Sequence, residues 1–262
     1  MAKRALITGS RGTIGGALRA HLEAQGWEVV GWDRSKIPND DYARMKAFVG
    51  DTAPTALFHL ATASQPTQTQ LSAEEVWSVN YEWTSELAWI TRELDIPFVF
   101  TSTVMVFTEA VAGPYTIAMR PDAAHDYGRT KKEAEARVFA QNPCARVARL
   151  GWQIGEALTG NQMAAWLQAR GGVEASTRWI PACSMLADTA AMLRQIAESR
   201  PGLYHVDGNE GWSFYDLAMA LRQRHGADWT IVPTFGRAYD QRLLDPRLEL
   251  PSLRSRLPQL VE

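Results

Sequence analysis

The chain has little cysteine, no excess of charge of one sign and no long apolar run. Its two cysteines, Cys144 and Cys183, lack the spacing of metal ligands, so we expect two reduced, buried thiols and neither a disulfide nor a metal site. With 27 basic and 29 acidic residues, the chain has no electrostatic reason to bind nucleic acid or an anionic membrane. It has no apolar stretch of about 18 residues that could span a bilayer, and its N-terminal apolar run is too short for a signal peptide. We therefore expect a cytoplasmic protein with neither nucleic acid nor membrane as a partner.

The sequence does contain a regular alternation of strand-like and helix-like segments over its first two thirds. Short apolar runs predict strands at 4–8, 28–32, 56–60, 97–101 and 145–150. Apolar residues at helical spacing predict helices at 14–25, 73–93 and 127–140. This alternation is typical of an α/β fold, a doubly wound parallel sheet with helices on both faces.

After Gly151 the alternation becomes irregular, which predicts a second, smaller lobe. A helix near 185–198 and a strand near 202–206 interrupt this irregular part, and the tail from 234 onward reads as loops and short helices. We assign residues 1–150, rejoined by about 185–207, to the first domain. The small C-terminal lobe then consists of 151–184 and 208–262, and 262 residues are enough for both parts.

A glycine-rich turn follows the first predicted strand and opens the first predicted helix. Gly9 permits a tight turn, Gly12 lets the backbone approach a pyrophosphate, and Gly15 lets helix and strand pack closely. The N-terminus of the helix then faces the phosphates of a dinucleotide. The sequence therefore predicts an NAD(P)H-binding Rossmann-type domain whose phosphate-binding turn consists of Gly9, Ser10, Arg11, Gly12, Thr13, Ile14 and Gly15.

The choice between NAD and NADP stays open. Asp33 ends the second predicted strand, where a carboxylate accepts hydrogen bonds from the adenosine ribose and repels a 2′-phosphate. Arg11 and Arg34 favour NADP instead, because either guanidinium can pair with its 2′-phosphate. The alternative for both arginines is a solvated surface charge.

Tyr127 and Lys131 are four residues apart, on one face of a predicted helix. A tyrosine has a pKa of about 10, so acid–base work near neutral pH needs a positive charge beside it, which Lys131 can supply. About two dozen residues upstream, an apolar strand ends in the hydroxyl side chains of Ser102 and Thr103. A hydroxyl at such a strand end can align a substrate carbonyl for hydride attack.

Together, Gly9xxGly12xxGly15, Ser102-Thr103xxVal106-Phe107 and Tyr127xxxLys131 resemble the extended short-chain dehydrogenase/reductase superfamily, closest to its dTDP-4-dehydrorhamnose reductase and NAD-dependent epimerase branch. The resemblance covers nearly the whole chain. It implies a Rossmann domain with a small substrate lobe, Thr103 as catalytic hydroxyl with Ser102 as the fallback, Tyr127 as acid and Lys131 as its activator. Further cofactor-binding residues that it implies are Leu60, Ala61, Thr62 and Asn80.

The same resemblance suggests substrate-binding residues, namely Ser102, Val104, Trp152, Asn161 and Arg242. Val104 is a departure, because the reductase branch usually has an acidic residue directly after the catalytic threonine. Trp152, Trp166, Trp179 and Trp212 could stack on a base, but core packing is the default. Arg237, Arg242 and Arg247 could clamp a diphosphate, or form a basic, solvated surface. Asp40 or Asp41 is a candidate for contact with adenine, His125 lies near Tyr127, and we interpret His59 as a core histidine.

Three functions are compatible with these patterns. The first is NAD(P)H-dependent reduction of a keto group on a nucleotide-linked sugar, with Tyr127, Lys131 and Thr103 in the roles given above. The second keeps the site but performs epimerisation or dehydration, with the cofactor oxidised and reduced within one cycle. The third is a non-catalytic, dinucleotide-binding regulatory subunit. The sequence also leaves a homodimer open.

Overall fold

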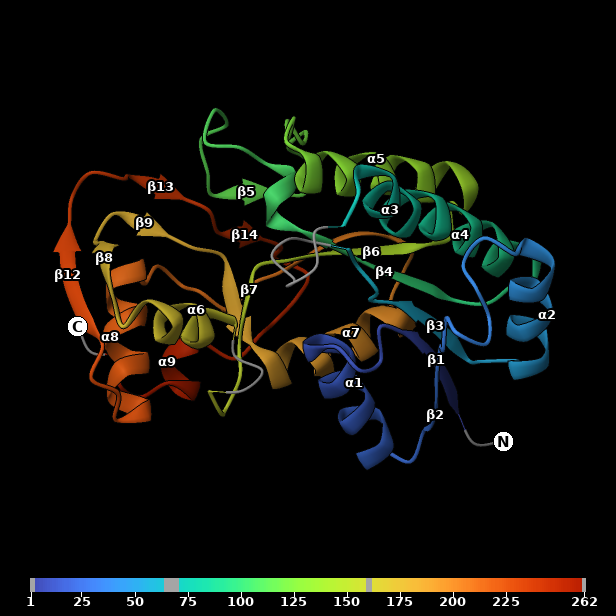
Figure 1. Cartoon of the computed structure of the whole chain (residues 1–262), viewed down its shortest axis with the longest axis horizontal. Coiled ribbons are helices and arrows are strands. Elements are labelled where there is room, and N and C mark those ends of the chain that lie inside the picture. Colours follow the sequence, from blue (N-terminus) through green and yellow to red (C-terminus); the bar gives the residue numbers. More distant parts are fainter. Residues whose placement is uncertain (1–2, 64–70, 159–161, 261–262) are drawn as a thin grey trace. The chain divides into compact units, whose positions relative to one another are not determined.

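The computed structural model describes residues 3–63, 71–158 and 162–260, and the chain divides into two compact units (Figure 1). The first unit comprises Met1–Thr108, Pro121–Ala148 and Leu193–Tyr204. The second comprises Glu109–Arg120, Arg149–Met192 and His205–Glu262. Among the described residues, no helix combines the length and the apolar character needed to cross a membrane.

The first unit is built on a six-stranded sheet whose order is β11-β6-β4-β3-β1-β2. Its strands are β1 (Arg4–Thr8), β2 (Glu28–Gly31), β3 (Ala56–His59), β4 (Phe98–Thr103), β6 (Arg146–Leu150) and β11 (Gly202–Val206). The pairs β1–β2, β1–β3 and β3–β4 are parallel. Because β2 and β3 lie on opposite sides of β1, the strand order reverses between β1 and β3. In open α/β sheets a ligand binds at such a switch point, beyond the carboxyl ends of the strands.

Helices cover both faces of this sheet (Figure 1). They are α1 (Thr13–Ala24), α2 (Tyr42–Thr52), α3 (Ala73–Trp77), α4 (Trp83–Glu93), α5 (Asp126–Gln141) and the C-terminal part of α7 (Leu186–Glu198). A π-helical turn, η1 (Ser78–Glu82), joins α3 to α4, and a 3₁₀ turn, η2 (Val104–Val106), follows β4. Alternate residues of a strand face opposite sides, so Leu6, Leu57 and Phe98 pack on one face against Leu87 of α4 and Val138 of α5.

Most of the predicted elements of this unit are confirmed. The strand at 4–8 and the strand at 202–206 have the predicted bounds, and the others agree within about two residues. The helix predicted over 73–93 contains the π-helical turn η1 instead of running as a regular α-helix. Helix α2 was not predicted; Asp41 caps its first turn by accepting a hydrogen bond from the backbone N–H of Arg44 at 3.0 Å. Asp41 is therefore a helix cap.

In its described residues, the second unit consists of short strand pairs, three further helices and the N-terminal part of α7. The pairs are β5 (Tyr115–Thr116) with β14 (Leu243–Leu244), β7 (Trp152–Ile154) with β10 (Cys183–Met185), β8 (Gly172–Ser176) with β12 (Thr230–Thr234), and β9 (Trp179–Ile180) with β13 (Tyr239–Asp240). The helices are α6 (Gln162–Arg170), α8 (Phe214–His225) and α9 (Leu253–Arg256). Every one of these strand pairs joins segments at least about 30 residues apart in the chain, so no local pattern in the sequence predicts the pairing.

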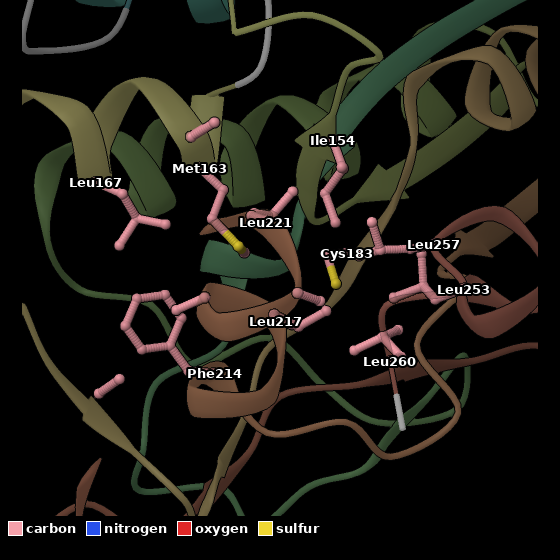
Figure 2. Close-up of a cluster of buried hydrophobic side chains, with 14 of the residues drawn as sticks. Ile154, Met163, Leu167, Cys183, Phe214, Leu217, Leu221, Leu253, Leu257 and Leu260 are labelled. Carbon is pink, nitrogen blue, oxygen red and sulfur yellow. The ribbon is translucent and has the colours of Figure 1, made fainter. Parts of the chain in front are cut away.

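A separate hydrophobic core holds the second unit together (Figure 2). Its fully buried side chains come from α6, α8, β8, the β7–β10 pair and the residue that ends α9, and include Ile154, Met163, Leu167, Cys183, Leu217, Leu221 and Leu257. The four tryptophans singled out from the sequence, Trp152, Trp166, Trp179 and Trp212, are partly buried and pack against this core. The expectation of core packing for these tryptophans is therefore confirmed.

Two expectations from the sequence need correction or adjustment. Both cysteines are free thiols as expected, but only Cys183 is buried, because Cys144 lies in the exposed turn between α5 and β6. The segment Glu109–Arg120, which the sequence analysis assigned to the first domain, belongs to the second unit. The reason is that β5 in this segment pairs with β14, which lies near the end of the chain.

Candidate active site

The glycine-rich turn joins β1 to α1 at the switch point of the sheet. Gly9 has a φ of +67°, and a Cβ there would lie 2.8 Å from the backbone nitrogen of Ala61, so both the turn and its close approach to the β3 loop require glycine. Gly12 is the N-cap of α1, and no side chain caps the first turn of that helix. The first backbone N–H groups of α1 can therefore donate to a bound anion, as the pyrophosphate of a dinucleotide would require. Ser10, Arg11, Thr13, Ile14 and Gly15 complete the turn and the start of α1.

Asp33 follows β2 and is held by its neighbour Ser35. One carboxylate oxygen accepts hydrogen bonds from the hydroxyl of Ser35 at 2.7 Å and from its backbone N–H at 3.0 Å. These bonds, together with the positive charges of Lys36 and Arg11, keep the pKa of Asp33 below its ordinary value. The carboxylate therefore stays ionised with one oxygen unused by Ser35, while Arg11 and Arg34 are both exposed. The structure thus keeps both the acidic and the basic features that leave NAD versus NADP open.

A buried hydrogen-bond chain through His59 fixes the loop after β3. The hydroxyl of Thr8 accepts the backbone N–H groups of Leu60 and Ala61, each at 3.1 Å, so its one hydrogen is donated to Nδ1 of His59 at 2.8 Å. The hydroxyl of Thr84 donates to the carbonyl of Asn80 and must accept from Nε2 of His59 at 2.9 Å. His59 is therefore the Nε2–H tautomer. Burial, and secondarily the charge of Lys131, hold its pKa well below the ordinary value. The interpretation of His59 as a core histidine is confirmed.

Asn80, in the π-helical turn, positions the continuation of this loop. Its Nδ2 donates to the carbonyl of Ala63 at 2.8 Å and to the hydroxyl of Thr130 at 3.3 Å. Its Oδ1 accepts the N–H of Ala63 at 2.8 Å and the hydroxyl of Thr62 at 3.1 Å. Asn80 is fully buried, and all four of these hydrogen bonds of its side-chain amide are made to other residues of the protein. The structure thus gives Asn80 a positioning role, whereas the sequence analysis predicted cofactor contact.

Tyr127 and Thr103 come together at the end of the sheet. Burial raises the pKa of the Tyr127 phenol, and the side-chain hydroxyls of Thr62 and Thr103 oppose that rise. Thr103 is the last residue of β4, and its hydroxyl also accepts the backbone N–H of Met105 at 3.2 Å. Neighbouring residues of a strand face opposite sides. Ser102 therefore faces the other side of the sheet from Thr103, and its hydroxyl is buried with no hydrogen-bond partner among the described residues.

Helix α5, which holds Tyr127, packs closely against η2, the turn that follows Thr103. A Cβ on Gly128 would lie only 2.2 Å from the carbonyl oxygen of Met105, so a larger residue would push the helix away from the turn. His125 is the N-cap of α5 and accepts the N–H of Gly128 through Nδ1 at 3.3 Å. The sequence analysis missed the role of Gly128, although a glycine directly after the tyrosine is a usable signal. Val104 is buried in η2.

Lys131 lies one turn further along α5 and is almost fully buried. Its Nζ is 4.4 Å from the centroid of the Phe100 ring. Burial lowers the pKa of Lys131 to about 7, although Glu135 opposes the shift. The sequence predicted a phenol made more acidic by the positive charge of Lys131. In the structure burial instead raises the pKa of the phenol and lowers that of Lys131 to about 7.

The predicted substrate-binding residues outside the first unit have their own partners. Trp152 contacts Trp166 edge to face at 6.5 Å, and Asn161 lies outside the described residues. The predicted diphosphate clamp consists of three arginines, each paired with an acidic side chain: Arg237 with Glu109, Arg242 with Asp240, and Arg247 with Asp245. These ion pairs differ from both expectations, a diphosphate clamp of unpaired arginines and a solvated basic surface.

Comparison with known proteins agrees with this arrangement. A dTDP-4-dehydrorhamnose reductase of Aggregatibacter actinomycetemcomitans is 27% identical over 235 residues, covering 83% of this chain and 78% of that protein. Methionine adenosyltransferase 2 subunit beta of Xenopus laevis is 24% identical over 240 residues, covering 84% of this chain and 71% of that protein. The crystal structure of dTDP-4-dehydrorhamnose reductase from Bacillus anthracis str. Ames in complex with NADP superimposes with a TM-score of 0.85 at 18% identity, covering 99% of this chain and 98% of that one.

The family relationship rests on almost the full length of the chain. The glycine turn, the strand-end hydroxyls and the Tyr127–Lys131 helix all lie within residues 3–248, the part that matches the sequence model of one family. The Rossmann-type fold predicted from the sequence is confirmed by the order of the parallel sheet and by the similar fold of the solved reductase. The chain belongs to the RmlD substrate binding domain family.

Proposed function

We propose that this protein is an NAD(P)H-dependent reductase that acts on a keto group of a nucleotide-linked sugar through Thr103, Tyr127 and Lys131. The observation that carries the proposal is the close packing of the start of α5, which holds Tyr127, against η2, the turn that directly follows Thr103 at the carboxyl end of β4. The family membership and a relative that is named as a dTDP-4-dehydrorhamnose reductase support the same reaction class. The solved structure with NADP supports the choice of cofactor.

Several residues of the first unit would contact a bound dinucleotide. The turn from Gly9 to Gly15 and the uncapped start of α1 would hold the pyrophosphate, and Asp33 would meet the adenosine ribose. The loop Leu60–Thr62 and Lys131 would lie along the nicotinamide half. When bound, NAD(P)H supplies the hydride that is added to the carbonyl carbon.

The protein residues supply the proton. Thr103 and Tyr127 both have hydroxyl hydrogens that can be donated to one carbonyl oxygen, which aligns it and stabilises the negative charge that develops there. The proton of the Tyr127 phenol moves to that oxygen, and the phenolate that remains is stabilised by neighbouring hydroxyls and by the ammonium form of Lys131. Water then returns a proton to the phenolate. A general acid of this kind contributes roughly 10²–10⁴-fold to the rate.

The direct test is oxidation of NADH or NADPH by the purified protein in the presence of 4-keto nucleotide sugars. We expect the absorbance of the reduced cofactor to fall only when the keto sugar is present, and a hydroxyl sugar to appear in equal amount. Binding of the cofactor without turnover on any keto sugar would contradict the proposal.

Experiments on the same purified protein distinguish the reductase from two alternative functions. An epimerase or dehydratase regenerates its cofactor in each cycle, so tightly retained NAD with conversion of the sugar and no net oxidation would favour that reading. A regulatory subunit is the second alternative, because one relative is named as a subunit of methionine adenosyltransferase. A stable complex with a methionine adenosyltransferase, combined with no activity on carbonyl substrates, would favour it.

A further inference from the structure

The aromatic ring of Phe100 lies beside the ammonium group of Lys131, and the reaction derived above does not use it. Phe100 is in the middle of β4, three residues before Thr103, and is fully buried. The Nζ atom of Lys131 is 4.4 Å from the centroid of this ring, inside the range of about 6 Å for a cation–π contact. Lys131 is itself only 2% exposed, so little water can solvate its charge.

Neighbouring elements fix the position of the Phe100 ring. In the parallel pairing of β3 with β4, Phe100 is in register with His59, and their rings are stacked with centroids 5.8 Å apart. Burial holds the pKa of His59 well below its ordinary value, so this neighbour is neutral and does not repel Lys131. Phe100 also belongs to the same core cluster as Ala134 and Val138 of α5, the helix that holds Lys131.

An aromatic ring and a carboxylate stabilise an ammonium group in different ways. The negative face of a ring attracts the cation electrostatically, and this attraction is stronger where water is excluded. A ring has no lone pairs, so it competes only weakly for the three N–H donors of the group. It also has no net negative charge that would repel a phenolate. A ring can therefore favour the charged lysine and leave its N–H groups available to oxygen acceptors.

We propose that Phe100 is a positioning residue for Lys131, whose ammonium group it holds in one place and favours in the charged form. The inference rests on the proposed function, in which the ammonium form of Lys131 stabilises the Tyr127 phenolate. Burial disfavours that form, and the charge of Glu135, also on α5, opposes the effect of burial. The ring of Phe100 acts in the same direction as Glu135.

The test replaces Phe100 with phenylalanine analogues that carry one, two or three ring fluorines. Fluorine withdraws electron density from the face of the ring and leaves its shape nearly unchanged, so the cation–π attraction weakens stepwise. Protein labelled with [¹³Cε]lysine is titrated by NMR with no cofactor added, and the Lys131 resonance is identified by its loss in Lys131→Met. We expect the titration midpoint of Lys131 to fall stepwise, by about one pH unit with three fluorines, the size of one desolvated cation–π contact.

Phe98 provides a matched control. It is on the same face of β4 two residues earlier, is equally buried, and stacks on His59 with centroids 6.3 Å apart. The same three analogues at position 98 should leave the midpoint of Lys131 near its wild-type value, because they change the core without changing the ring beside Nζ.

The rate on the keto sugar provides the second readout. A midpoint lowered from about 7 to about 6 reduces the charged fraction of Lys131 about tenfold at pH 8 and hardly at all at pH 5. With three fluorines at position 100, kcat should therefore fall about tenfold at pH 8 and stay near the wild-type value at pH 5.

A Lys131 midpoint that does not move with fluorination of Phe100 overturns the inference, even if reductase activity is found. An equal shift on fluorination of Phe98 also overturns it. A stepwise shift that is confined to position 100, without activity on any keto sugar, supports the role of Phe100 and overturns the proposed function instead.

Discussion

At the scale of single residues, burial decides the protonation of the candidate catalytic groups. Tyr127 and Lys131 are four residues apart on α5, and burial acts on both in the direction that disfavours charge: it raises the pKa of the phenol and lowers that of the amine to about 7. The hydroxyls of Thr62 and Thr103 and the carboxylate of Glu135 oppose these shifts. The reactivity of the site therefore depends on the neighbours of the pair as much as on the pair itself.

Glu135→Gln tests this balance through the pH dependence of the rate. The charge of Glu135 raises the pKa of Lys131, so its removal lowers that pKa further below about 7. Because the ammonium form stabilises the phenolate, kcat should fall with rising pH at the basic end, and this fall should move to lower pH in the variant. Stopped-flow rates measured from pH 5 to 9 would detect the change.

A suitable control is Glu133→Gln on the same helix. Glu133 is half-exposed and pairs with Arg129 at 3.4 Å, a surface contact that contributes little. The control should keep the wild-type profile. Identical profiles for Glu135→Gln and wild type would show that Lys131 does not titrate in the working range.

At the scale of elements, the loop after β3 is held by side chains from β1, η1 and α4. Thr8 donates to His59, which is fully buried like Thr8 itself, and accepts the backbone N–H groups of the partly buried Leu60 and Ala61. Thr8→Val keeps the shape and leaves those three groups without their partner. Since each buried unsatisfied group costs about 1–3 kcal/mol, we expect a loss of about 3 kcal/mol in the free energy of unfolding, measured by urea denaturation.

Thr8→Ser retains the hydroxyl and should stay within about 1 kcal/mol of wild type. Equal stabilities of Thr8→Val and wild type would mean that the hydrogen-bond chain through His59 contributes nothing to the fold. The same pair of variants can be assayed for NADPH binding, which should weaken only where the Leu60–Ala61 loop is released.

The element scale also explains what could be predicted from the sequence. Strands and helices with a clear period, such as β1 and α5, were predicted because burial of one face imposes that period. The π-helical turn was missed because a single turn of this kind is too short to be recognised from the spacing of apolar residues. The partners of Thr62, Asn80 and Gly128 were missed for another reason: they depend on contacts between segments far apart in the chain, which no local spacing records.

At the scale of the whole molecule, the two units differ in how their strands are paired. The first unit has its sheet built from successive strand–helix repeats, so its fold and its glycine turn followed from local patterns. In the second unit, two-residue strands such as β5 and β14 pair across more than 100 residues of sequence. The irregular part of the chain was recognised as a separate lobe, but the inclusion of Glu109–Arg120 in it could not be predicted.

Asp207 holds these distant segments of the second unit together. One of its oxygens accepts the backbone N–H groups of Cys183 and Asn209, at 3.0 and 2.9 Å, and the other accepts that of Leu243 at 2.8 Å. Asp207→Ala leaves three buried donors without a partner, which should cost about 3–5 kcal/mol in the free energy of unfolding. Differential scanning calorimetry measures this as a lower Tm.

The matched variant Asp207→Asn keeps one carbonyl oxygen in place and should lose about half as much. The folded-state contacts of Tyr127, which lies in the first unit, should be unchanged in both variants, as judged by its NMR resonance. A Tm of Asp207→Ala within one degree of wild type would refute this account of the second unit.

The central claim is that the Tyr127 phenol gives its proton to a substrate carbonyl beside a bound nicotinamide. The most direct measurement is the single-turnover rate of NADPH oxidation by a keto nucleotide sugar in Tyr127→Phe, together with the Kd for NADPH. The account predicts a rate at least 10²-fold lower with the Kd changed by less than threefold, because only the proton donor is removed. A variant that turns over at the wild-type rate, or that loses NADPH binding while its residual rate is unchanged, would contradict it.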